Sequence, residues 1–114
     1  KNLVDIVGPG VAKDLFFTAR RIDAAEAQRV GLISRTCETD ALPALLAEYT
    51  TAMDQNAPLT IAAAKAITRE ILKPSPELDK ALCTSLIRGC FESADYTEGR
   101  KAFMEKRKPV FTGR

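Results

Sequence analysis

The chain has 114 residues, the size of one small domain, and 46% of them are apolar, which is enough for a hydrophobic core. Seventeen basic and fifteen acidic side chains leave a net charge of only +2, which argues against a general polyanion binder, so we expect no nucleic-acid partner. The sequence contains no histidine, so the commonest general acid/base near neutral pH is not available to it.

The cysteines and the hydropathy pattern favour a cytoplasmic protein. Cys37, Cys83 and Cys90 are an odd number without a Cys-X-X-Cys pair, which favours neither a disulfide framework nor a structural zinc site. We expect them to be small hydrophobic side chains in a reducing compartment. No apolar run approaches the ~20 residues of a membrane span, and the first residues lack the apolar core of a signal peptide. We therefore expect neither a metal nor a membrane partner.

Two short helices are predicted in the first third of the chain. The apolar spacing in VAKDLFFTA predicts a helix from about Val11 to Ala19. Asp23 is a favourable N-cap, Glu26 completes a capping box three residues later, and Gly31 lies where a helix C-terminus takes a left-handed residue. The next residues, LISRTCE, fit either an edge strand or an extended connector.

Longer helices are predicted in the middle of the chain. From Asp40, the segment DALPALLAEYTTAMDQNA carries an apolar stripe at helical spacing. The helix in PLTIAAAKAITREILK is predicted to open at Pro58 and to close before Pro74. In SPELDKALCTSLIRGCFES, Ser75 is the expected N-cap and Pro76 the first helical residue.

A last helix is predicted to begin near Asp95, which with Glu98 forms another capping box, and to run to about Lys108, where Pro109 stops it. The sequence thus predicts five or six helices with at most one short strand. Its apolar, turn-rich beginning, KNLVDIVGPG, has no leading element to pack against, so we expect a piece of a longer polypeptide.

Three segments resemble the crotonase superfamily, which includes the enoyl-CoA hydratases and isomerases. The first is GPGVAKDLFFTARRIDAAEAQRVGLISRTCETDAL, and the last is ESADYTEGRKAFMEKRKPVFTGR. Between them, APLTIAAAKAITREIL is similar to a further helix of the family. Each segment alone carries little information, but the three follow in the order and spacing of the family and cover essentially the whole chain.

The resemblance implies a mainly α structure, the helical C-terminal segment of an α/β crotonase-like (ClpP/crotonase-like) spiral fold. The β-β-α spiral of that fold would lie upstream and is missing from this chain. Residues 1–38 would be the end of the spiral core, and residues 39–114 would form a helical segment for oligomerisation and coenzyme A contact. Members of the family form trimers or dimers of trimers, so the resemblance implies a homo-oligomer.

The same resemblance implies that the parent protein is an enoyl-CoA hydratase, a lyase of fatty acid metabolism that adds water across the α,β double bond of an acyl-CoA. The alternatives are an enoyl-CoA isomerase of the same superfamily and a non-enzymatic helical assembly module. Acyl-CoA would be the substrate, and no further cofactor is expected. Because the family's catalytic carboxylates and oxyanion hole lie upstream, we assign no catalytic residue and expect the isolated chain to be inactive.

Four carboxylates are the candidates to replace a missing acid/base pair: Glu26, Asp40, Glu70 and Glu98. A carboxylate pair in an active site needs two groups a few ångströms apart that are partly desolvated. These four are scattered over separate predicted helices, mostly at capping or exposed positions. We therefore interpret them as helix caps and solvated side chains.

The segment EGRKAFMEKRKPVF contains the predicted binding residues. On a helix, Phe103 and Lys106 share one side, as do Phe103 and Arg107, so an aromatic ring for a purine lies beside cations for a phosphate. In the crotonase family, residues matching Phe103 and Lys106 contact the adenine and phosphate end of coenzyme A, and the resemblance assigns that role here. The alternative is that Phe103 anchors the last helix in the core. The basic residues would then form a solvated face: Lys101, Lys106, Arg107 and Lys108.

Overall fold

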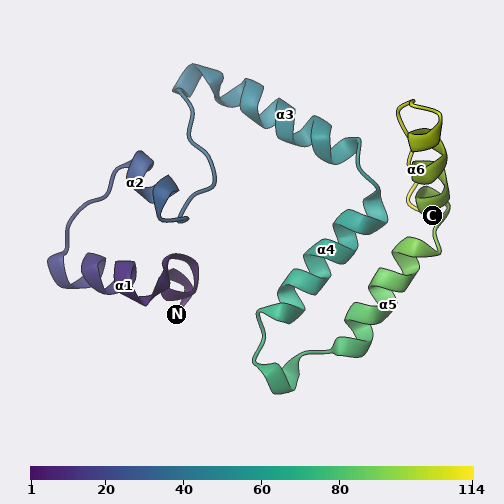
Figure 1. Cartoon of the computed structure of the whole chain (residues 1–114). Coiled ribbons are helices and arrows are strands. Elements are labelled where there is room, and N and C mark those ends of the chain that lie inside the picture. The colour runs from purple at the N-terminus through teal and green to yellow at the C-terminus, as the bar shows by residue number, and fades with distance from the viewer. The chain divides into compact units, whose positions relative to one another are not determined.

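The computed structural model describes all 114 residues and contains helices and connecting segments without a β-strand (Figure 1). It divides into two compact units, Lys1–Leu45 and Leu46–Arg114. The predicted functional division after residue 38 stays a prediction. No helix combines the length and the apolar character that a membrane span requires.

In the first unit, α1 (Asn2–Thr18) is interrupted at Gly8, whose φ of 77° and ψ of 163° lie outside the helical region. Pro9 follows this break and lacks the N–H that a continuous helix would need. The helix predicted from Val11 is therefore confirmed, but a further helical turn precedes the break. At the other end, Ala19 adopts a left-handed φ of 49° and terminates α1.

The predicted N-cap of α2 (Ala24–Arg29), Asp23, is confirmed, whereas the Glu26 side chain binds arginines instead of completing the predicted capping box. The Asp23 carboxylate accepts a hydrogen bond of 2.7 Å from the Glu26 N–H. At the C-terminal end, Gly31 has a φ of 80°, and the Leu32 N–H donates to the Ala27 carbonyl oxygen at 2.9 Å. This is a Schellman motif, in which the left-handed residue lets the next amide bond backwards. The segment LISRTCE, which follows Gly31, is a connector and not the edge strand that was the alternative.

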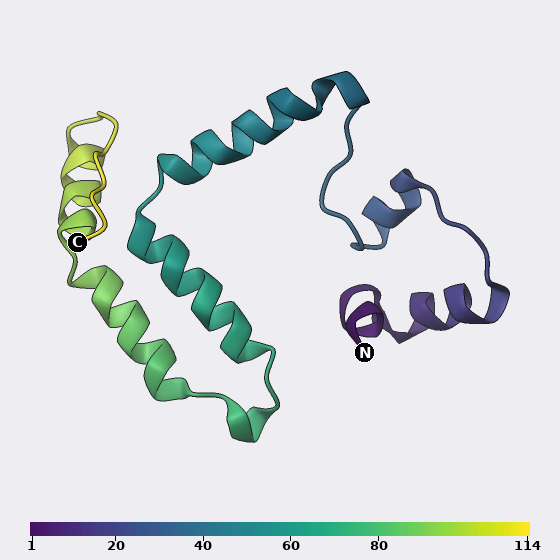
Figure 2. The same ribbon diagram turned by 180° about the vertical axis from the view of Figure 1, so that it is seen from behind.

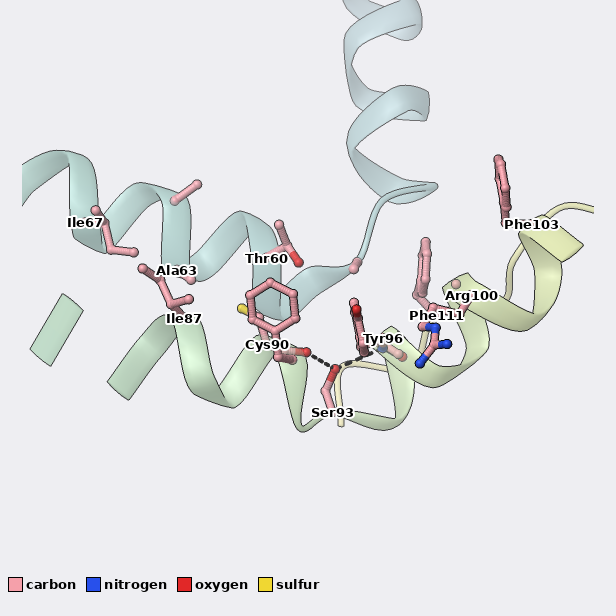
Figure 3. Close-up of a pocket in the computed structure, with 15 residues that line it drawn as sticks. Thr60, Ala63, Ile67, Ile87, Cys90, Ser93, Tyr96, Arg100, Phe103 and Phe111 are labelled. Carbon is pink, nitrogen blue, oxygen red and sulfur yellow. Dashed lines mark hydrogen bonds between the residues drawn. The ribbon is translucent and has the colours of Figure 1, made fainter. Parts of the chain in front are cut away.

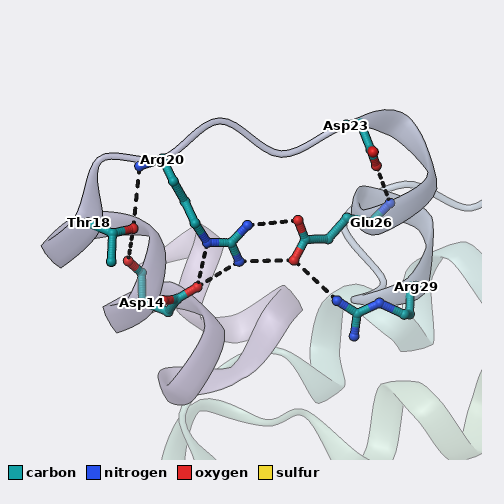
Figure 4. Close-up of polar contacts among 6 residues, drawn as sticks. All are labelled: Asp14, Thr18, Arg20, Asp23, Glu26 and Arg29. Atoms are coloured by element: carbon teal, nitrogen blue, oxygen red, sulfur yellow. Dashed lines mark hydrogen bonds and ion pairs between the residues drawn. The ribbon is translucent and has the colours of Figure 1, made fainter.

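An arginine bridges the two helices of this unit (Figure 4). Arg20 Nε donates to Asp14 Oδ2 at 2.8 Å, and its two terminal nitrogens donate to the Glu26 carboxylate at 2.7 and 2.9 Å. The Arg20 hydrogen bond is the main cause that lowers the pKa of Glu26, and Arg29 contributes a smaller charge effect. The Glu26 carboxylate is therefore a partner of arginines, and it is the Glu26 backbone N–H that takes part in the capping of α2.

The boundary between the units falls within α3 (Leu42–Asp54), which is preceded by a 3-10 turn, Thr39–Ala41. The predicted start at Asp40 thus lies in this turn rather than in the α-helix. α3 contains no buried residue. The apolar stripe that identifies this helix in the sequence is largely exposed: Leu42, Leu46, Tyr49 and Met53.

In the second unit, α4 (Pro58–Ile71) and α5 (Lys80–Phe91) lie side by side and run in opposite directions (Figure 2). The prediction for α4 is confirmed, whereas the predicted start of α5 is wrong. Ser75–Glu77 forms only a 3-10 turn, and Leu78 is extended with a ψ of 116°. The N-cap is Asp79, whose carboxylate accepts from the Leu82 N–H at 2.8 Å.

Glu70 organises the connection between α4 and α5. Its side chain is almost buried, accepts from Lys73 Nζ at 2.6 Å and also accepts from the Asp79 N–H at 3.2 Å. The Lys73 contact, followed by the Asp79 N–H, lowers the pKa of Glu70. The expectation of a solvated Glu70 is wrong, because this carboxylate stabilises the turn that brings α5 back along α4.

Small side chains make up most of the interior. The buried apolar residues are Val7, Ala12, Ala27, Ala63 and Ala102. Most of the larger apolar side chains remain accessible, including Phe16 and Phe17 in α1 and Ile71 in α4. The amphipathic patterns therefore predict the helices correctly, but their apolar faces are not covered within this chain.

Candidate functional site at the C-terminal helix

The predicted site lies on α6 (Ala94–Met104), whose predicted start near Asp95 is confirmed, whereas its predicted cap and its predicted C-terminal end are wrong. Ser93, not Asp95, is the N-cap, because its hydroxyl oxygen accepts from the Tyr96 N–H at 3.0 Å. The helix ends at Met104 rather than near Lys108. The predicted capping box between Asp95 and Glu98 is absent, since both carboxylates bind the residues that follow α6.

Asp95 holds the end of the chain. It is 2% exposed and accepts from the backbone N–H groups of Thr112, at 2.7 Å, and Gly113, at 2.8 Å. Its own N–H donates to the Arg114 carbonyl oxygen at 3.1 Å. These bonds return the C-terminal residues to the start of α6 and satisfy a carboxylate that would otherwise be buried without partners.

A second carboxylate holds the middle of the same return segment. Glu98 accepts a pair of hydrogen bonds from Arg107, at 2.6 and 2.9 Å, and another from the Val110 N–H at 2.9 Å. Mainly because of Arg107, and secondarily because of Val110, the pKa of Glu98 falls to about 2. We call residues 105–114, held by Asp95 and Glu98, the C-terminal clasp.

The turn between α6 and the clasp places Lys106 outside the helix. Lys106 has a left-handed φ of 53°, its N–H donates to the Phe103 carbonyl oxygen, and the Arg107 N–H donates to the Ala102 carbonyl oxygen. This is a Schellman motif with lysine at the position that usually holds glycine. The expectation that Phe103 and Lys106 share a helical face is therefore wrong. Their predicted role in binding stays a prediction.

Phe103 is an exposed aromatic residue in the last turn of α6. Its relative exposure is 82%, so it does not anchor the helix in the core of this chain. It borders an open apolar groove of about 620 Å³ between α4, α5 and α6, which Phe111 of the clasp also lines (Figure 3). The Phe111 ring also lies 3.5 Å from the position that a Cβ on Gly99 would occupy, which is an ordinary van der Waals distance, so the clasp packs directly against this part of α6.

Phe103 also borders a second hollow, of about 370 Å³, on the surface of α6. We call it the α6 hollow, and its lining residues are Thr97, Arg100, Lys101, Phe103 and Met104. Arg100 lies over the Tyr96 ring, 5.9 Å from its centroid. Arg100 was not singled out from the sequence, and Lys101 was considered there only as part of a solvated basic face, whereas both line this hollow. The signal for them is their position three and four residues after Thr97, on one face of the helix.

The remaining candidate groups form no reactive constellation. Asp40 is exposed in the turn before α3. No cluster of cysteine and carboxylate side chains is arranged to hold a metal ion. Cys37 is exposed, while Cys83 and Cys90 are partly buried on α5.

Residues 1–114 match a family described as enoyl-CoA hydratase/isomerase. The chain belongs to the enoyl-CoA hydratase/isomerase family. This confirms the resemblance to the crotonase superfamily, and the all-helical structure corresponds to the helical C-terminal part of the crotonase-like fold.

Individual relatives show how much of the family's length the chain represents. It is 38% identical to a probable enoyl-CoA hydratase of Mycobacterium leprae, covering 100% of this chain and 44% of the relative. It is 34% identical to the methylmalonyl-CoA decarboxylase of Escherichia coli, covering 98% of this chain and 44% of that relative. A crystal structure of an enoyl-CoA hydratase from Bacillus anthracis matches with a TM-score of 0.84 and 30% identity, covering 100% of this chain and 44% of that one. The chain thus spans less than half the length of these relatives.

Proposed function

We propose that this chain is the coenzyme A-contacting and assembly segment of an enoyl-CoA hydratase, which adds water across the α,β double bond of an acyl-CoA thioester. The observation that carries the proposal is the family match over residues 1–114. The named relatives are a hydratase and a decarboxylase, and both names specify a coenzyme A thioester. The substrate class is therefore better supported than the reaction.

In this proposal, Phe103 and Lys106 contact the nucleotide end of acyl-CoA. Phe103 presents an exposed ring on which adenine could stack, and Lys106 carries an ammonium group that makes no ion pair within the chain. A charge-assisted hydrogen bond from an ammonium group to a phosphate oxygen is stronger than a neutral one. The left-handed backbone at Lys106 directs the chain away from the helix axis at the point where this contact would form.

Catalysis would come from residues outside this chain. Glu26, Glu70 and Glu98 are each bound to basic side chains, so none is an unengaged general acid or base. The thioester carbonyl would be polarised by backbone N–H groups of the remaining part of the enzyme. The isolated chain should therefore show no hydration of a short enoyl-CoA.

The exposed apolar faces of the helices support a role in assembly. Leu42, Leu46 and Met53 leave much of the α3 stripe accessible, and an apolar surface of this kind commonly marks an interface. We propose a cytoplasmic homo-oligomer, a trimer or a dimer of trimers. Sedimentation of the full-length protein as a monomer at high concentration would contradict this part of the proposal.

A product assay of the full-length protein tests the reaction. Incubation with a 2-enoyl-CoA should yield the 3-hydroxyacyl-CoA, which mass spectrometry detects as the addition of one water molecule. Conversion of a 3-enoyl-CoA to the 2-enoyl isomer, without hydration, would instead identify an isomerase. If neither thioester is converted and the protein only assembles, the non-enzymatic module is the correct interpretation.

A further inference from the structure

The end of the chain joins two helices that have little direct contact. α4 packs along α5, and α6 meets α5 over a shorter stretch, whereas α4 and α6 have no comparable contact. The Gly113 N–H donates to the Asp95 carboxylate, at the start of α6, at 2.8 Å. A Cβ on Gly113 would also lie 3.7 Å from Pro58 Cβ, at the start of α4. The clasp therefore ties the first turn of α6 to the first residue of α4.

The other attachment of α6 is a short connection to α5. Only Glu92 and Ser93 separate the two helices. The Ser93 hydroxyl donates to the Cys90 carbonyl oxygen at 2.7 Å (Figure 3). The rings of Phe91 and Tyr96 meet edge to face, with their centroids 5.0 Å apart. All of these contacts lie at the junction, so a rotation there would change the angle between α6 and α4.

The tie of the clasp to α4 is formed by its last residues. Asp95 accepts from the N–H groups of Thr112 and Gly113, which holds Gly113 in its place beside α4. The preceding residue, Phe111, packs on Gly99 of α6 and lines the apolar groove. We call these contacts the inner tie. They link the groove-lining ring to the only part of the clasp that lies against α4.

A second set of contacts holds the clasp nearer to the end of α6. Glu98 accepts from Arg107 and from the Val110 N–H. We call these contacts the outer tie. Its three residues belong to α6 and to the clasp, so the outer tie does not connect either of them to α4. The two ties can therefore be opened separately.

We propose that residues 111–113 act as a strap that sets the width of the apolar groove between α4, α5 and α6. With the strap fastened, Phe111 lines the groove and α6 keeps a fixed angle to α4. When the inner tie opens, α6 pivots about its connection to α5 and the groove widens. This conformational device follows from contacts within the chain, so it is independent of the proposed reaction.

The test is a distance measurement between α4 and α6 in the full-length protein. Spin labels are attached through genetically encoded ketone side chains in place of Lys65 on α4 and Lys101 on α6, both of which are exposed. This chemistry leaves the native cysteines unlabelled. Assembly with an excess of unlabelled protein limits each oligomer to one labelled chain. Double electron–electron resonance should then give one narrow distance distribution for the protein with the native clasp.

Release of the inner tie should broaden this distribution. Asp95→Asn removes the carboxylate that accepts from two backbone N–H groups, and Phe111→Ala removes the ring that packs on α6. Each variant should increase the width of the distribution about twofold and extend it to longer distances, because α6 then samples several angles. Arg107→Gln is the matched control, since it opens only the outer tie and should keep the native width.

Three results would overturn the proposal. They are a native width in a folded inner-tie variant, equal broadening in Arg107→Gln, and a distribution that is already broad with the native clasp. Far-UV circular dichroism establishes whether each variant keeps its helices. If Asp95→Asn does not fold, Phe111→Ala decides the question, because the Phe111 side chain is only partly buried and its loss leaves every hydrogen bond of the clasp in place.

Discussion

Arg107 and Glu98 form a two-point ion pair, with Nη1–Oε1 and Nη2–Oε2 distances of 2.6 and 2.9 Å, that ties the clasp to the middle of α6. Because Arg107 is bound to Glu98, it is not a free cation of the basic cluster that the end of the sequence suggests. It also fixes the direction in which the chain leaves the helix, since Val110 donates to the same carboxylate. A segment that looks like a basic tail is thus a folded element.

The pH dependence of this ion pair is predictable in sign. Because the pKa of Glu98 is lowered from 4.5 to about 2, its contribution to stability is fully present above pH 4.5 and is lost as the pH falls toward 2. A titration of the Glu98 carboxyl carbon by NMR measures this directly. In Arg107→Gln, the pKa should rise toward 4.5. An unchanged low pKa in that variant would show that the arginine is not the cause.

Loss of the Asp95 carboxylate should release the clasp. Asp95→Ala leaves the N–H groups of Thr112 and Gly113 without their acceptor, so the free energy of unfolding should fall by about 1–3 kcal/mol. Urea denaturation followed by far-UV circular dichroism provides the measurement. Asp54→Ala, at an exposed position that makes no ion pair, is the matched control and should change stability by less than about 0.5 kcal/mol. Equal losses in the two variants would argue against the clasp.

The left-handed backbone at Lys106 predicts an unusual stabilisation. Glycine adopts a φ of 53° without the steric conflict of a Cβ, so Lys106→Gly should be more stable than Lys106→Ala by about 0.5–1 kcal/mol. In an ordinary helical position, the order would be reversed. Thermal or urea denaturation of the two variants distinguishes these cases. Higher stability of the alanine variant would indicate that Lys106 has a helical backbone conformation.

The Arg20 bridge in the first unit requires the planar guanidinium group. Arg20→Lys cannot donate to Asp14 and to both oxygens of Glu26 at once, so the backbone amides of α2 should exchange with solvent faster. Hydrogen exchange read by NMR tests this, with Arg21→Lys as the control because Arg21 makes no ion pair. Equal exchange rates in both variants would mean that the bridge does not stabilise α2.

The local pattern of the sequence predicts the helices better than it predicts their ends. The cap at Asp23 and the left-handed Gly31 are recognisable because all the groups involved are within a few residues. Ser93 and Asp95 are equally good cap candidates by local rules. The choice between them depends on Thr112, seventeen residues away from Asp95, which binds that carboxylate.

The same limitation applies to the candidate site. Phe103 is recognisable from family resemblance, but its spacing to Lys106 is misleading because the helix stops before Lys106. A Schellman motif without glycine carries no clear sequence signal. The apolar stripe of α3 is recognisable in the sequence, but its pattern does not identify the surface against which it would pack. These features depend on contacts between distant residues or with other chains, which periodicity does not report.

The measurement that tests the central claim most directly compares two substrates on the full-length protein. The claim is that α6 and the residues next to it contact the nucleotide end of acyl-CoA. For Lys106→Ala, kcat/KM with an enoyl-CoA should fall by a factor that corresponds to roughly 1–2 kcal/mol, mostly through KM, because the contact is remote from the reacting carbons. Phe103→Ala is a second informative variant, since its exposed ring leaves no cavity in this chain when it is removed.

The control is the corresponding enoyl-pantetheine, which keeps the reacting thioester and lacks the nucleotide. If the account is correct, the penalties of Lys106→Ala and Phe103→Ala disappear with this substrate, and both variants hydrate it at the native kcat/KM. If kcat/KM of either variant falls by the same factor with both substrates, or if only kcat falls, the substituted residue has a structural role. That result would contradict the assignment of this surface to coenzyme A.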